Sequence, residues 1–198
     1  YRIKGGIGHS DWSAGGMQPH LADKMLDYLD DNKNSDKPFF LYMALTAPHI
    51  PLFPSKEFKG KSRIGDYGDL VMMIDDIVGR VNRKLKEIGK YDDTIVMFAA
   101  DNGCAGYINM DKINRKGHYP SYIYRGYKSH GWEGGHRIPF ILSWGDRYGH
   151  VIDNSLVSLT DLYATFADML GYRTADDEAE DSFSFWPILD GSGSSART

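Results

Sequence analysis

The stretch TIVMFAADNG, Thr94–Gly103, decides the fold class of this chain. A run of β-branched and other apolar residues, typical of a buried strand, ends abruptly in an aspartate, an asparagine and a glycine. Asp, Asn and Gly are ordinary turn residues, so on local grounds this ending is a turn. Whether it is also a functional site depends on where the strand lies in the fold.

Helical periodicity occurs in three places along the sequence. Apolar residues three or four apart predict one amphipathic helix from Leu21 to about Asp31 and a longer one over residues 66–89, where Gly89 is a natural terminator. The stretch TDLYATFADMLG, residues 160–171, predicts a third helix with Thr160 as its N-cap. Each helix has an apolar face that must pack against another element.

Two more apolar runs predict strands. FFLYMAL, Phe39–Leu45, is too short and too uniformly apolar for a surface helix and predicts a buried strand. RIPFILSW, Arg137–Trp144, predicts a third strand after a long polar loop. The order of strand, helix, strand, loop, strand and helix predicts an α/β fold with a mostly parallel sheet flanked by helices.

Composition excludes several classes of protein. The 198 residues, 41% hydrophobic and 25% charged, are typical of a globular domain with a substantial core. A formal charge of -4 does not provide the broad basic field that nucleic-acid binding usually needs. No apolar run approaches the roughly 18 residues of a membrane span. The single cysteine, Cys104, excludes an internal disulfide framework.

Polar residues follow two of the predicted strands. Asp101 and Asn102 come directly after the apolar run TIVMFAA, and His49 follows Phe39–Leu45 in APHIPL, between two prolines that restrict the backbone. Ligands of open α/β sheets bind at the carboxyl ends of the strands, so these residues predict a site. His49 taken alone is equally consistent with a partly buried histidine bonded to a carbonyl group.

The loop before the third strand carries a third polar cluster. In YRGYKSHGWEGGHRIP, residues 124–139, Lys128 lies among glycines that permit close backbone approach. One interpretation is a solvated loop with a surface lysine; a loop this long in a compact domain is, however, more often functional. Together the three clusters offer two oxygen ligands for a hard cation, and an imidazole and an ammonium group for an anionic ligand.

The order of these motifs resembles a known family. APHIPL, TIVMFAADNG and GYKSHGWEGGHRIPFILSWG, with GDYGDLVMMIDDIVGRVNRKL between the first two, closely resemble the sulfatase family, the formylglycine-dependent branch of the alkaline-phosphatase-like superfamily. The resemblance extends from about Gly16 to Leu189. It implies an alkaline-phosphatase-like α/β fold and a sulfuric ester hydrolase that cleaves sulfate esters.

The resemblance also implies a role for each candidate residue. Asp101 and Asn102 match a pair of the family's calcium ligands, and the remaining ligands are expected outside this chain. Lys128 matches the lysine that binds the sulfate oxygens. His49 matches the histidine that contacts the sulfate and protonates the leaving oxygen. Both His49 and Lys128 are therefore expected to bind substrate and to take part in catalysis.

One part of the family pattern is missing from the sequence. The family's formylglycine nucleophile arises from a Cys/Ser-x-Pro-Ser/Thr-Arg motif, and neither Cys104, in NGCAGY, nor any serine stands in such a motif. We therefore expect residues 1–198 to be the middle-to-late part of a sulfatase catalytic domain, with an incomplete fold and no activity as an isolated chain. The nucleophile is expected outside this chain.

Two alternatives stay open at this point. A phosphatase or phosphodiesterase of the same superfamily would share the sheet, although it would normally bring further His and Asp ligands for zinc. A non-catalytic module that binds sulfated glycans would explain the missing nucleophile. An aromatic content of 13% is compatible with a surface that contacts carbohydrate. The resemblance further implies a periplasmic or secreted protein.

Overall fold

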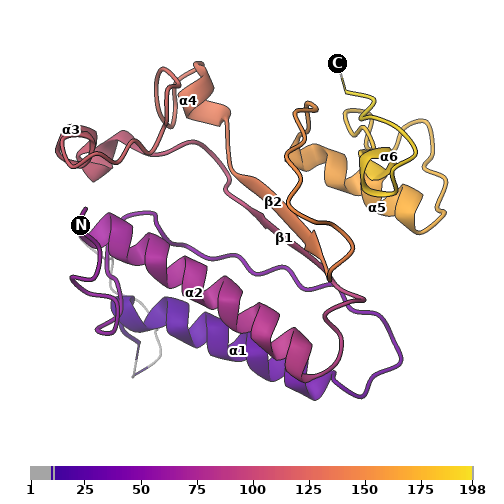
Figure 1. Ribbon diagram of the computed structural model, residues 1–198, viewed down its shortest axis with the longest axis horizontal. Helices are drawn as coiled ribbons and strands as arrows, with labels where there is room; N and C mark the ends of the chain where they lie inside the picture. The colour runs from indigo at the N-terminus through magenta and orange to yellow at the C-terminus, as the bar shows by residue number, and fades with distance from the viewer. Residues whose placement is uncertain (1–9, 11, 198) are drawn as a thin grey trace. The chain divides into compact units, whose positions relative to one another are not determined.

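The computed structural model describes residue 10 and residues 12–197, and the chain divides into two compact units. The first unit ends at Tyr148 and the second begins at Gly149. Figure 1 shows the order of the elements along the chain. None of the helices in the described residues is long and apolar enough to cross a membrane.

Two long helices form the main core of the first unit. α1 spans Met17–Asp31 and α2 spans Asp66–Glu87, and the two lie side by side in Figure 1. Their facing side chains bury a cluster at helical spacing, and a guanidinium–carboxylate pair of 2.6 Å joins Arg80 to Asp23 at its edge. The buried cluster consists of Ala22, Met25, Leu70, Met73 and Ile77.

Both helices confirm the periodicity, with small differences at their ends. α1 begins four residues earlier than predicted, directly after the short 3-10 helix η1, Ala14–Gly16. The hydroxyl of Ser13 accepts a hydrogen bond from the N–H of Gly16 and starts this segment. α2 ends at Glu87, and Gly89 follows with a φ of 70°, a left-handed conformation that suits glycine at the end of a helix.

The segment predicted as a buried strand, Phe39–Leu45, is neither buried nor a strand. Met43 and Leu45 pack against the helix core, but Phe40 is 74% exposed and Tyr42 is 80% exposed. Exposed and packed side chains thus alternate, as they do in an extended chain that is covered on one face. A strand requires a hydrogen-bonded neighbour, and the described residues place none beside this segment, so the apolar run alone did not produce one.

A two-stranded sheet forms in the described residues of the first unit. β1, Ile95–Ala99, pairs with β2, Phe140–Trp144, in a register that runs from Ile95 opposite Trp144 to Ala99 opposite Phe140. Both strands were predicted, but the prediction of a mostly parallel sheet is wrong for this pair, which is antiparallel. The reason is the connection between the strands. It leaves β1 at Ala99 and enters β2 at Phe140, directly opposite, whereas parallel strands need a connection that crosses over to the other end of the sheet.

The connection between β1 and β2 contains three short helical segments. These are the 3-10 helix η2, Gly106–Ile108, and the helices α3, Met110–Asn114, and α4, Glu133–His136. Ile108 and Ile113 are buried and anchor η2 and α3 to the first unit. The rest of the connection is irregular, as the weak periodicity of its sequence indicates.

The second unit is built around a buried carboxylate. A 3-10 helix η3, Leu159–Asp161, leads into α5, Leu162–Met169, and a short helix α6, Trp186–Leu189, follows. Asp161 is fully buried and forms a capping box with Ser158, so the cap is Ser158 and the prediction of Thr160 is wrong.

Arg197 closes this second unit. Its guanidinium lies 2.5 Å from one carboxylate oxygen of Asp161 and 2.8 Å from the other. Burial alone would raise the pKa of the Asp161 carboxyl, but hydrogen bonds from Arg197 and from the N–H groups of Phe183 and Ser158 outweigh it and hold the pKa below its usual range.

Candidate functional site

The candidate metal ligands follow the end of β1. The strand ends at Ala99, and the chain bends through Asp101, which is exposed, and Asn102, which is half-buried. Neither side chain hydrogen-bonds to another group within residues 12–197. A carboxylate and an amide oxygen are thus available together, and both are hard donors of the kind that Ca²⁺ prefers.

These two ligands do not form a complete metal site by themselves. Among the described residues, no group of three or more His, Cys, Asp or Glu side chains could hold a metal ion. Calcium takes six to eight oxygen ligands, so Asp101 and Asn102 fit this ion as part of a larger set.

The glycine loop, which we define as residues 124–136, is locked against the chain that follows Asn102. The N–H of Gly103 donates to the carbonyl oxygen of Gly135 at 3.0 Å, and the N–H of Lys128 donates to that of Cys104 at 2.8 Å. A Cβ atom on Gly103 would lie 2.0 Å from the carbonyl oxygen of Gly134, so only glycine allows this approach. The structure therefore brings the segment after Asn102 and the loop that carries Lys128 together through their backbones.

Backbone contacts also hold the glycine loop internally. The N–H of Gly134 donates to the carbonyl of Arg125 at 2.8 Å, and that of Gly135 donates to the carbonyl of Trp132 at 2.7 Å. A Cβ atom on Gly135 would lie 2.0 Å from the carbonyl oxygen of His130. The half-buried Lys128 side chain is not needed for any of these bonds and makes no hydrogen bond within the described part of the chain.

His49 lies in a turn, with one ring nitrogen engaged. Its Nδ1 is 2.7 Å from the carbonyl oxygen of Ile50, and because a carbonyl oxygen only accepts, Nδ1 carries the proton of this bond. The bond to a carbonyl group agrees with the structural interpretation of His49, but the ring is exposed and not partly buried. Nε2 is left for a ligand. The ring also packs edge-on against Tyr107 of η2, with 5.5 Å between ring centroids, which places His49 near the segment after Asn102.

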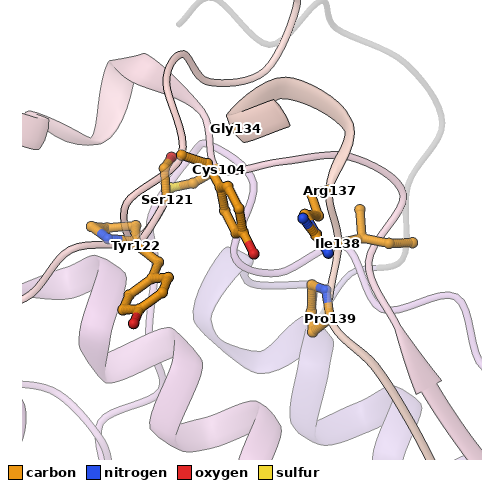
Figure 2. Close-up of a pocket in the computed structure, with 9 residues that line it drawn as sticks. Cys104, Ser121, Tyr122, Gly134, Arg137, Ile138 and Pro139 are labelled. Carbon is orange, nitrogen blue, oxygen red and sulfur yellow. The ribbon is translucent and has the colours of Figure 1, made fainter. Parts of the chain in front are cut away.

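A cavity of about 280 Å³ opens beside the glycine loop. Figure 2 shows Cys104, Tyr122 and Arg137 around it. The guanidinium of Arg137 pairs with Glu133 at 3.2 Å and lies 4.7 Å from the ring centre of Tyr124, which also lines the cavity. None of the four predicted site residues lines this cavity, which adjoins the predicted site through Cys104 and Gly134.

Nothing in the sequence indicated that Tyr67 contacts Cys104. The thiol donates a long hydrogen bond, 3.7 Å, to the phenol oxygen of Tyr67 in the first turn of α2. Burial is the main cause that raises the pKa of both the thiol and the phenol above their usual values. The two residues are 37 positions apart, and no local pattern in the sequence marks Tyr67 as a neighbour of the site.

Comparison with known proteins identifies the family of this chain. The family model of the sulfatases matches residues 9–172. The chain is 33% identical over 190 residues to an N-acetylgalactosamine-6-O-sulfatase of Bacteroides thetaiotaomicron, and the match covers 91% of this chain and 37% of that protein. It is 37% identical to an arylsulfatase of Hemicentrotus pulcherrimus, with 88% of this chain and 30% of that protein covered.

Solved structures agree with the sequence comparison. A protein from a study of glycosaminoglycan metabolism in Bacteroides thetaiotaomicron superposes with a TM-score of 0.84 at 31% identity, and the match covers 94% of this chain and 39% of that one. The PsFucS1 sulfatase of Pseudoalteromonas superposes with a TM-score of 0.79 at 28% identity, over 93% of this chain and 36% of that one.

These matches bear on two predictions made from the sequence. The α/β fold of the sulfatase type is confirmed by the solved structures, although the chain spans only about a third of the length of the relatives it matches. The resemblance read from the ordered motifs is confirmed by the family model. The chain belongs to the sulfatase family.

Proposed function

We propose that this chain is the middle and later part of the catalytic domain of a sulfuric ester hydrolase. The observation that carries the proposal is the contact between the glycine loop and the chain that follows β1. Backbone bonds hold the Lys128 segment against the chain that follows Asp101 and Asn102, and His49 packs against Tyr107 of the same segment. These are the residue types that bind and cleave a sulfate ester, on a chain of the sulfatase family.

Lys128 would bind the sulfate group of the substrate. Its backbone is fixed by the bond to Cys104, while its ammonium group makes no hydrogen bond among the described residues. A lysine is a compact positive charge suited to a single anionic oxygen. Held in a preorganised loop, such a donor stabilises the negative charge that builds up on the transferring group, an effect of about 10²-fold in rate.

His49 would protonate the oxygen of the leaving alcohol. The bond from Nδ1 to the carbonyl of Ile50 orients the ring and leaves Nε2 as the atom that carries the transferred proton. The edge-on contact with Tyr107 restricts rotation of the imidazole. Without a proton this oxygen would leave as an alkoxide, a strong base, so a proton delivered to it lowers the barrier to cleavage of the sulfur–oxygen bond.

Asp101 and Asn102 would hold part of a Ca²⁺ site. A bound Ca²⁺ ion would neutralise negative charge on the sulfate oxygens and fix their orientation. The formylglycine of the family, expected outside this chain, would supply the nucleophile that attacks sulfur. The residues of this chain are therefore proposed to position the ester, balance its charge and deliver the proton.

The substrate class that we propose is a sulfated carbohydrate. This part of the proposal rests on the relatives, which include an N-acetylgalactosamine-6-O-sulfatase and a structure of Ps i-CgsB bound to a neocarrahexaose. The second is 27% identical, with a TM-score of 0.73 over 89% of this chain. Such polymers lie outside the cytoplasm, so we propose a periplasmic or secreted protein, which fractionation of the producing cells tests directly.

Turnover of sulfate and phosphate esters by the full-length protein tests the proposal. We expect hydrolysis of 4-nitrophenyl sulfate and of a sulfated sugar, with little hydrolysis of 4-nitrophenyl phosphate. Chelation with EGTA should remove activity, and added Ca²⁺ should restore it. Lys128→Ala should lower turnover about 10²-fold, whereas Lys24→Ala, the same change at an exposed site on α1, should not.

Three results would count against this function. Preferential hydrolysis of the phosphate ester would favour a phosphatase of the same superfamily. Binding of sulfated sugar without turnover would favour the glycan-binding module. Equal activity of Lys128→Ala and Lys24→Ala would return Lys128 to the role of a surface lysine.

A further inference from the structure

An exposed strip of positive charge lies apart from the proposed catalytic residues. It consists of two segments, residues 56–63 and 111–118, which we call the basic strip. Together they contain seven Lys and Arg side chains against two carboxylates, in a chain whose formal charge is -4. All nine charged side chains are exposed. They are Lys56, Glu57, Lys59, Lys61, Arg63, Asp111, Lys112, Arg115 and Lys116.

Tertiary contacts bring the two segments of the strip together. The ammonium group of Lys116 donates to the carbonyl oxygen of Arg63 at 2.5 Å, across 53 positions of sequence. The ring of His118 lies 6.4 Å from the ring of Tyr67, the residue that contacts Cys104. The strip is therefore one surface, and Tyr67 connects it to the segment that follows Asn102.

A buried carboxylate fixes the first segment of the strip. Asp69, which is fully buried in α2, accepts hydrogen bonds from the N–H of Gly60 at 2.8 Å and from the N–H of Ser62 at 2.6 Å. Gly68 allows the segment to approach closely, because a Cβ there would lie 2.0 Å from the hydroxyl of Ser62. The cations of this segment thus project from a rigid backbone, which lowers the entropy lost when they bind a ligand.

The positive groups of the strip are mostly without acidic partners. Lys59 pairs with Asp66 at 2.6 Å, but the side chains of Arg63, Lys112 and Arg115 make no ion pair or hydrogen bond among residues 12–197. The helix pair, α1 and α2, differs, because most of its Lys and Arg side chains have acidic partners. The pairs in these helices and in the turn after α1 are Lys24 with Asp27, Lys33 with Asp30, Arg80 with Asp23, Arg83 with Asp76 and Lys84 with Glu87.

We propose that the basic strip binds the polyanionic chain of a sulfated polysaccharide, outside the site that holds the ester being cleaved. The inference rests on the proposed function for the identity of the polymer. Unpaired cations on a rigid surface attract an extended polyanion and raise its local concentration. A substrate that carries many sulfates would be held by the strip while one ester occupies the site near Lys128.

Binding and turnover measured separately test this inference in the full-length protein. The binding probe is fluorescently labelled dextran sulfate, measured by anisotropy at 0.15 M NaCl, with uncharged dextran as its blank. The triple variant Arg63→Ser, Lys112→Ser, Arg115→Ser removes three unpaired cations. It leaves the bond from Lys116 in place, because that bond uses the carbonyl of residue 63.

We expect the triple variant to bind dextran sulfate about tenfold more weakly, since exposed ion contacts are individually weak but add along a polymer. Its turnover of 4-nitrophenyl sulfate should be unchanged, because this small ester does not reach the strip. A matched triple variant, Lys24→Ser, Lys33→Ser, Arg83→Ser, removes the same charge from α1, the turn after it and α2, and should bind dextran sulfate within about twofold of wild type. Rising salt should weaken wild-type binding.

Specific results would overturn the inference. An equal loss in both triple variants would show a non-specific charge effect, and an unchanged affinity in the strip variant would exclude the strip. Tighter binding of a single-stranded oligonucleotide than of dextran sulfate, lost in the same variant, would assign the strip to nucleic acid. Failure of the proposed function is distinguishable, because absence of ester turnover leaves the anisotropy measurement valid.

Discussion

The helix pair and the glycine loop of the first unit are held together by different parts of the chain. Between α1 and α2 the side chains make the contacts, through a buried apolar cluster and the pair of Arg80 with Asp23. In the glycine loop the backbone makes them, through bonds such as that from Gly103 to Gly135. The side chain of Lys128, which makes no hydrogen bond among the described residues, is consequently available to a ligand.

This difference separates stability from function within one unit. A residue of the helix pair cannot change size without disturbing its neighbours, because protein interiors are close-packed. In the glycine loop the backbone contacts restrict chiefly the glycines, where two backbones touch. Substitutions in the two regions should therefore fail in different ways.

The largest effect is expected where two backbones meet. Gly135→Ala places a Cβ atom 2.0 Å from the carbonyl oxygen of His130 and 3.0 Å from that of Tyr127, so the chain itself must move. We expect a local cost of more than about 4 kcal/mol and loss of sulfate-ester turnover in the full-length protein. Gly131→Ala is the matched control, because a Cβ there meets nothing within 4 Å. Equal turnover in the two variants would refute the role of the backbone contact.

The second unit is stabilised in a third way, by the ion pair between the buried Asp161 and Arg197. Asp161→Asn breaks the pair with Arg197, and loss of one partner of a buried pair costs about 3 kcal/mol or more. Asp168→Asn, an exposed carboxylate on α5, is the control. Thermal unfolding of the full-length protein should show the loss in the first variant alone.

The pH dependence of the same site has a definite sign. Because the folded pKa of Asp161 is depressed, its contribution is fully present above the unfolded value of about 3.9 and is lost as pH falls through the lower folded value. The wild type should therefore lose more stability below about pH 4 than Asp161→Asn. Parallel pH profiles for the two proteins would contradict this.

The smallest of these effects is expected in the helix pair. Met73 is 1% exposed and Met72, its neighbour in α2, is 42% exposed. Met73→Ala should lower the free energy of unfolding by about 3 kcal/mol while leaving turnover per folded molecule unchanged. Met72→Ala should cost little in either measurement. A drop in turnover that matches the drop in stability would show that the helix pair and the loop are not separable.

The sequence was sufficient where side chains leave a periodic signal. The spacing of Leu70, Ile74 and Ile77 predicted α2 almost to its final residue, and the apolar runs predicted β1 and β2. The sequence was insufficient where the formation of a strand depends on pairing with a neighbouring strand. The run Phe39–Leu45 has the composition of a strand, but a strand also needs a neighbour, and composition does not supply one.

The site shows the same division. Asp101, Asn102 and His49 were recognised as chemically suited residues after predicted strands and Lys128 as one in the loop before a strand, and their roles stay a prediction. The Lys128 segment meets the chain after Asn102 through backbone bonds, which carry no side-chain signature, and His49 meets it through a ring contact with Tyr107. The contact of Tyr67 with Cys104 and the meeting of residues 56–63 with 111–118 depend on folding over long sequence separations, which a local pattern does not encode.

The position of Cys104 gives the loop a built-in chemical reporter. Only the thiolate form of cysteine attacks a disulfide reagent, and burial keeps the pKa of this thiol raised while the glycine loop is closed. Opening of the loop would expose the sulfur and return its pKa toward that of free cysteine. Because Cys104 is half-buried and lines the cavity, 5,5′-dithiobis(2-nitrobenzoic acid) should label this single thiol slowly in the folded chain, and faster under conditions that loosen the glycine loop.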